Sequence, residues 1–159
     1  MNLNVYVWGG IITAITSLSI SLFVYFKNRK GLINKTFSLF TLSIWLWSFC
    51  WVEMIISSRE ATALIWAKGL SIGNIFISVF YLHSICVMSN ITVKKKNILI
   101  ANYIFAFMLL FLCFFTNLFI KGVAPIFSFN YHIKPGPLYI LHFLSFIIVG
   151  CIPLFPYLL

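Results

Sequence analysis

Carboxylates, the side chains that most often act as general acids, bases and metal ligands, are almost missing from this chain. Only two, Glu53 and Glu60, occur among its 159 residues. The histidines His83, His132 and His142 have no acid close in sequence and no HExxH motif, so they are expected to be isolated residues with ordinary hydrogen bonds. A serine-hydrolase nucleophile turn and a glycine-rich phosphate loop are not found either. The sequence therefore predicts no catalytic, metal-binding or cofactor-binding residue, and the chain is not expected to be an enzyme.

Glu53 and Lys68 are the charged side chains that lie deepest in apolar segments. Each stands about one turn inside the end of its segment, and a six-residue turn, SREATA, joins the two segments. An ionisable group inside a membrane is costly unless it is paired or hydrated. Two interpretations follow: the two side chains pair, or each extends separately to the lipid headgroups.

A polar stripe marks the apolar segment that contains Lys68. Its members recur at spacings of three or four and so share one face of a helix. They are Lys68, Ser71, Asn74, Ser78 and Tyr81. Such a face either forms hydrogen bonds with neighbouring helices or lines a ligand cavity.

Small residues predict close helix packing at two places. Near the amino terminus a shallow groove is formed by residues four apart, namely Gly9, Thr13, Ser17 and Ser21. Gly69 and Gly73 form a second ridge, away from the polar stripe. Small residues allow the backbones of two helices to approach each other closely.

The connection at 121–136 is the most aromatic one. Phe127, Phe129 and Tyr131 alternate with polar residues that include His132, a period-two pattern that predicts a short strand or hairpin. This segment is expected to cap the helices or to form the rim of a ligand site. The alternative is a belt of interfacial aromatic residues.

The composition excludes an ordinary soluble domain. Hydrophobic residues make up 62% of the chain and charged residues only 8%, against about 25% charged in soluble domains. The sequence predicts an all-α, polytopic transmembrane bundle in a single domain, 1–159. Five spans are expected, at about 5–26, 36–57, 64–88, 97–120 and 137–159.

The basic residues predict the orientation of these spans. Most fall in two loops on one side, as Lys27, Arg29, Lys30, Lys35, Lys94, Lys95 and Lys96. The positive-inside rule places these loops in the cytoplasm and the amino terminus outside, in a multi-pass protein of the plasma membrane. Because the cations stand between apolar runs, the predicted partner is a bilayer with anionic headgroups and not a nucleic acid.

Several runs resemble the N-terminal seven-transmembrane region of bacterial sensor histidine kinases. The run from Asn34 to Trp47, NKTFSLFTLSIWLW, is similar to the start of that family's second helix, where an Asn, a Phe three residues later and an apolar stretch ending in Trp are typical. The run ALIWAKGLSIG, 63–73, looks like its third helix, and 80–83 and 136–139 also fit. The resemblance implies a sensor domain truncated after about five of seven helices. Pro153 and Pro156 near an unanchored end agree with a fragment, and any kinase or cyclase activity would reside in a missing C-terminal module.

Two functions are therefore expected. The first is a membrane-embedded sensory input domain that recognises a small-molecule or peptide signal, with a homodimer as a further expected assembly. Its candidate signal-binding or helix-coupling residues are Glu53, Lys68, Ser71, Asn74, Phe129, Tyr131 and His132. The alternative is a small transporter subunit or membrane-assembly protein. A transporter needs a polar path through the membrane, whereas the polar stripe fades beyond Tyr81.

Overall fold

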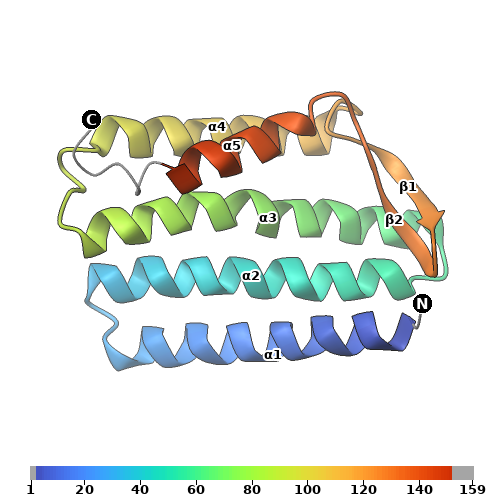
Figure 1. The fold of residues 1–159 in the computed structure, drawn as a ribbon, viewed down its shortest axis with the longest axis horizontal. Helices are drawn as coiled ribbons and strands as arrows, with labels where there is room; N and C mark the ends of the chain where they lie inside the picture. The colour runs from blue at the N-terminus through green and yellow to red at the C-terminus, as the bar shows by residue number, and fades with distance from the viewer. Residues whose placement is uncertain (1–2, 152–159) are drawn as a thin grey trace.

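Long helices follow the apolar segments, as uninterrupted apolar runs without internal proline require. The computed structural model describes residues 3–151 (Figure 1). Its elements are α1 (Leu3–Lys27), α2 (Leu32–Ile56), α3 (Glu60–Met88), α4 (Lys96–Phe115), β1 (Ile120–Ile126), β2 (Phe129–Pro135) and α5 (Ile140–Cys151). Within this range, α1 to α4 are the helices long and apolar enough to cross a membrane.

The predicted hairpin is confirmed and forms a two-stranded antiparallel sheet. Strands β1 and β2 pair from Ile120 with Pro135 to Ile126 with Phe129. Phe127, at the tip, has φ 54° and is 91% exposed. The sheet lies across one end of the bundle, while the two basic loops lie at the opposite end (Figure 1). The relative placement of loops and hairpin is therefore as expected.

The ends of the helices differ from the predicted bounds. Helix α2 begins at Leu32 rather than at 36, so Lys35 lies in its first turn and not in the loop. Helix α3 begins at Glu60 rather than at 64, with a carboxylate in its first turn, where the helix dipole favours negative charge. Charged residues such as Lys35 and Glu60 are expected in loops. Here both lie in the first turn of a helix, where a side chain can still reach polar surroundings.

Helix α4 is shorter than predicted. It ends at Phe115 instead of 120, because the backbone is extended at Thr116 and then turns into β1. The N–H and the hydroxyl of Thr116 both donate to the Leu112 carbonyl, at 3.2 and 2.6 Å. Helix α5 begins at Ile140 instead of 137, after a turn closed by a hydrogen bond from the Tyr139 N–H to the Gly136 carbonyl. The remainder of the predicted fifth span, with Pro153 and Pro156, lies outside the described residues.

Helix α3 is the central element. It packs against α2, α4, α5 and both strands, whereas α1 packs mainly on α2. A Cβ atom at Gly73 would lie 2.6 Å from the Trp47 backbone nitrogen and 2.8 Å from the Ser43 carbonyl oxygen, so α2 and α3 touch through their backbones. At Gly69 it would lie 2.8 Å from the Cys50 Sγ. The predicted glycine ridge on α3 is confirmed.

The predicted groove on α1 is confirmed in its second half only. Ser17 and Ser21 are buried, and the hydroxyls of Ser21 and Ser38 each donate to the carbonyl of the other residue at 2.9 Å. Gly9, by contrast, is exposed, and the close approach is made by its neighbour Gly10, which packs on α2. Residues spaced four apart drift around a helix of about 3.6 residues per turn. The buried face of α1 instead follows spacings of four, three and four residues, through Gly10, Ala14, Ser17 and Ser21.

Candidate functional site

The structure gives Glu53 and Lys68 different neighbours. Glu53 is partly buried and lines a groove between α1 and α2, beside Ile11. The Lys68 Nζ atom lies 5.7 Å from the centre of the Phe114 ring on α4, within range of a cation–π interaction. No ion pair joins the two side chains within the described part of the chain, so of the two interpretations the contacts favour separate environments over a pair.

The polar stripe on α3 lies mostly between helices. The Ser71 hydroxyl donates to the Ala67 carbonyl at 2.9 Å and also adjoins the Cys113 thiol on α4. The Ser78 hydroxyl donates to the Ile75 carbonyl at 2.9 Å. The buried serines therefore satisfy themselves largely on their own helix, which small hydroxyl residues can do in apolar surroundings. Their burial agrees with the helix-packing interpretation more than with an open polar cavity.

Further along α3, the stripe ends in aromatic packing. Tyr81 is half-buried, with its ring 5.8 Å from the Phe40 ring on α2. Asn74 is also half-buried. Ser78 and Tyr81 also line an apolar pocket of about 320 Å³ with Phe40 of α2 and Phe146 of α5. Lys68 alone among the members of the stripe carries a charge.

The histidines are only partly as expected. His83 has its Nδ1 atom 2.9 Å from the Tyr103 hydroxyl, an ordinary hydrogen bond between α3 and α4. His142 is 2% exposed, and its Nδ1 atom has no hydrogen-bond partner among the described residues. The rings of Phe119 and Phe146 lie beside it, at 6.5 and 5.4 Å. His142 is therefore a buried aromatic residue of the core and not a satisfied histidine.

The hairpin docks on the bundle through Phe129. The Phe129 ring lies 5.2 Å from the Tyr6 ring on α1 and 6.1 Å from the Trp51 ring on α2, both in edge-to-face geometry. Beside it, the Asn130 amide donates to the Ser57 carbonyl at 3.2 Å, at the end of α2. The hairpin therefore holds α1, α2 and the turn before α3 together.

Tyr131 and His132 complete this cap. The His132 ring stacks on Phe129 at 6.3 Å, and Tyr131 is half-buried against the main apolar core. Of the predicted site residues, the structure thus brings Phe129, Tyr131 and His132 together on the hairpin. Capping of the helices, one of the two roles expected for this segment, is what the contacts support.

Replacing Phe129 by alanine is expected to lower the free energy of unfolding by about 2 kcal/mol, because a half-buried aromatic anchor is lost. Phe127→Ala is the matched control and should change it by less than about 0.5 kcal/mol, since this ring is almost fully exposed. Denaturation of the protein in mixed micelles, followed by tryptophan fluorescence and circular dichroism, measures both. Equal effects of the two changes would show that the hairpin is not docked through Phe129.

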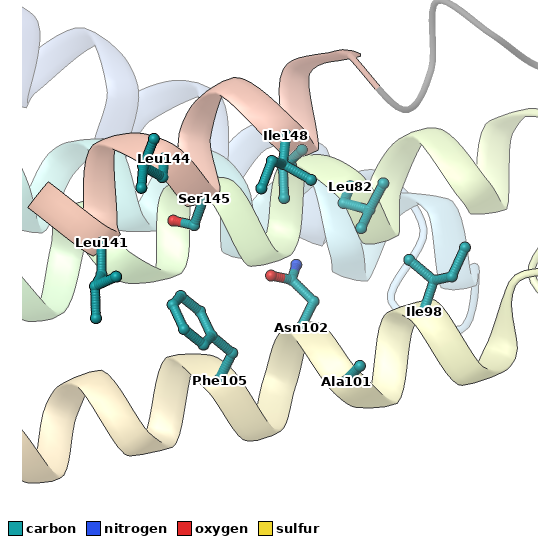
Figure 2. A pocket seen from close by; sticks show the side chains of 10 residues that line it. Leu82, Ile98, Ala101, Asn102, Phe105, Leu141, Leu144, Ser145 and Ile148 are labelled. Atoms are coloured by element: carbon teal, nitrogen blue, oxygen red, sulfur yellow. The ribbon is translucent and has the colours of Figure 1, made fainter.

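A cavity that sequence reasoning missed lies between α3, α4 and α5 (Figure 2). Its volume is about 400 Å³, and its walls are apolar except for Asn102 and Ser145. The Asn102 side chain rises from α4 toward the other two helices, and its Nδ2 atom is buried without a hydrogen-bond partner among the described residues (Figure 2). In the sequence, the signal for this cavity was the Asn102 amide inside a predicted span. Asn102 is uncharged and has no polar neighbour at helical spacing.

Comparison of the chain with protein-family models, curated proteins and solved structures finds no match. The class of protein is therefore defined by the fold. Within residues 3–151, four helices of membrane-spanning length and a shorter fifth helix form an apolar bundle, closed at one end by a two-stranded sheet.

Proposed function

We propose that the protein is a multi-pass plasma-membrane protein and the sensory input domain of a signal-transducing receptor of the histidine-kinase type. Large apolar side chains on the outer faces of α1 and α4 support the membrane location. Phe23 is 69% exposed, Ile104 65% and Phe107 61%, which in water would leave extensive apolar surface uncovered. In a bilayer these side chains contact lipid tails.

The two ends of the bundle support the proposed orientation. Basic residues gather at the end that holds the loops 28–31 and 89–95, where they would meet anionic headgroups of the inner leaflet. Arg29 also lies over the Phe26 ring, with its Cζ atom 4.4 Å from the ring centre. The hairpin end then faces outward and is the part of the chain that a signal outside the cell reaches first.

The observation that carries the sensory proposal is the docking of Phe129 on Tyr6 and Trp51. Through this contact, a small molecule or peptide that shifts the hairpin changes the position of two long helices at once. A signal acts only if it binds one helix arrangement better than another. The hairpin also buries Ile120, Val123 and Ile133 in the main core, so a shift of the hairpin would move the helices with it, and the helices would carry the difference to the cytoplasmic loops and an effector.

Cysteine labelling tests the orientation. In a background without native cysteines, Asn130→Cys should react with a membrane-impermeant maleimide on intact cells, because this residue is exposed on the hairpin. Asn28→Cys and Lys94→Cys, also at exposed positions, should react only after permeabilisation. Labelling of position 28 or 94 on intact cells would overturn the proposed topology.

Transmission through the bundle is tested by the same reporter. In permeabilised membranes, undocking the hairpin with Phe129→Ala should change the rate of maleimide reaction at Asn28→Cys by about fivefold or more, the lower range of allosteric coupling. Phe127→Ala serves as the control and should leave the rate unchanged. An unchanged rate in both backgrounds would contradict a sensory role and favour a transporter subunit or assembly protein.

A further inference from the structure

The cavity between α3, α4 and α5 is too large and too apolar to be explained as ordinary packing space. Protein interiors are close-packed and contain few voids larger than a water molecule, whereas this cavity measures about 400 Å³ and is partly open to the surface, where Leu144 is 47% and Ile148 60% exposed. That volume is at the lower end of the range for small-molecule sites. Leu82, Phe105 and Leu144, one from each helix, form its walls (Figure 2).

The polar groups in the cavity define what can fill it. The Ser145 hydroxyl donates to the His142 carbonyl at 2.7 Å, so its proton is already used. The Asn102 Nδ2 atom is buried and unpartnered among the described residues, which leaves N–H donors directed into an apolar space. In a membrane no bulk water can satisfy such a donor, and burying it alone is unfavourable.

Water is a poor occupant of this cavity. An ordered buried water normally forms two to four hydrogen bonds with polar groups. The described lining offers a water only Asn102 and the Ser145 hydroxyl oxygen, at most two hydrogen bonds, because Ile98, Ala101, Phe105 and Leu82 offer none through their side chains. A hydrocarbon chain would fill the volume but would leave the amide unsatisfied. The cavity therefore fits a molecule with an apolar body and one hydrogen-bond acceptor.

We propose that this cavity binds a small, uncharged hydrophobic molecule with a carbonyl oxygen, such as a ketone, ester or lactone. The carbonyl oxygen accepts a hydrogen bond from the Asn102 Nδ2, and the hydrocarbon part lies against Leu82, Phe105 and Leu144. No charged side chain among the described residues lines the cavity, so the site disfavours an ionised ligand. The assignment rests on the proposed sensory function, for which it names a class of signal that reaches the bundle through the lipid.

The experiment uses a matched pair of probes. Tritiated 2-nonanone and n-nonane are bound to the protein in lipid nanodiscs, with binding to empty nanodiscs subtracted. The ketone is expected to bind saturably and about tenfold more tightly than the alkane, the effect of one hydrogen bond in a dry site. Asn102→Leu should abolish this preference and retain alkane binding.

Two further variants act as controls. Asn97→Leu changes the same residue type at an exposed position of α4 and should keep the preference for the ketone. Leu144→Trp fills the cavity and should abolish saturable binding of both probes, with helix content unchanged by circular dichroism.

Three results would overturn the assignment. Equal affinities for ketone and alkane would assign the cavity to an alkyl chain, such as a lipid tail. A ketone preference that persists in Asn102→Leu, or no saturable binding above empty nanodiscs, would also refute it. Because none of these measurements uses a signalling readout, their failure leaves the sensory proposal standing, and failure of the coupling experiment leaves ligand binding standing.

Discussion

Replacing Gly73 by leucine is expected to lower the free energy of unfolding by about 3 kcal/mol, the upper range for overpacking a well-filled site. The reason is that the new side chain meets backbone, which cannot rotate away. A Cβ atom there would lie 2.6 and 2.9 Å from the nitrogen and Cα of Trp47 on α2. The two helices must separate, and the most extensive helix pair in the bundle loses contact along its length.

Gly9→Leu provides the comparison, because nothing lies within 4 Å of a Cβ atom at this position of α1. It should leave stability unchanged or raise it by up to about 1 kcal/mol, since an exposed helical glycine gains helix propensity when replaced. Unfolding in mixed micelles, followed by circular dichroism, measures both variants. Equal stability of Gly73→Leu and Gly9→Leu would contradict the close approach of the α2 and α3 backbones at Gly73.

Gly136→Val is expected to release the base of the hairpin, with a loss of about 3 kcal/mol in stability. Gly136 closes the hairpin where its N–H donates to the Phe119 carbonyl at 2.8 Å. A Cβ atom there would collide with the Leu118 carbonyl and lie 2.9 Å from that of Asn117. The chain between α4 and β1 cannot move aside without breaking this bond.

Gly122→Val is the matched change on the same hairpin, since a Cβ atom at Gly122 has no neighbour within 4 Å. It should be neutral or stabilising, because valine favours strands. Amide hydrogen exchange of the strand residues distinguishes the two variants: exchange should accelerate throughout both strands in Gly136→Val only. Slow exchange in both would mean that the hairpin does not depend on the contact at Gly136.

Helix positions and the hairpin could be predicted because they depend on local pattern. Apolar runs, glycine spacing on α3 and the alternation around Phe129 are properties of neighbouring residues, and the structure confirms them. The end of α4 was missed because the backbone becomes extended at Thr116 and continues into a strand, although the Thr116 N–H still donates to the Leu112 carbonyl. A run that is apolar on both sides of this point gives no signal of the change.

The candidate site was harder to predict because it depends on which helix faces meet. Glu53 and Lys68 lie at similar depths, but depth does not show that one faces α1 and the other α4. Asn102 has no periodic partner on its own helix, and its importance arises only from the cavity formed with α3 and α5. Such sites become visible only when distant segments are placed together.

The unequal lengths of α3 and α4 determine which bilayer thickness suits this protein. With 29 and 20 residues, they measure about 43 and about 30 Å at 1.5 Å per residue, and only the shorter one matches a typical hydrocarbon thickness. The strands, which pack on α3 beyond the end of α4, complete the shorter wall. A thicker bilayer would bring acyl chains against unpaired strand edges, which hydrocarbon does not tolerate. We therefore expect the protein to accept thinning of its bilayer far more readily than thickening.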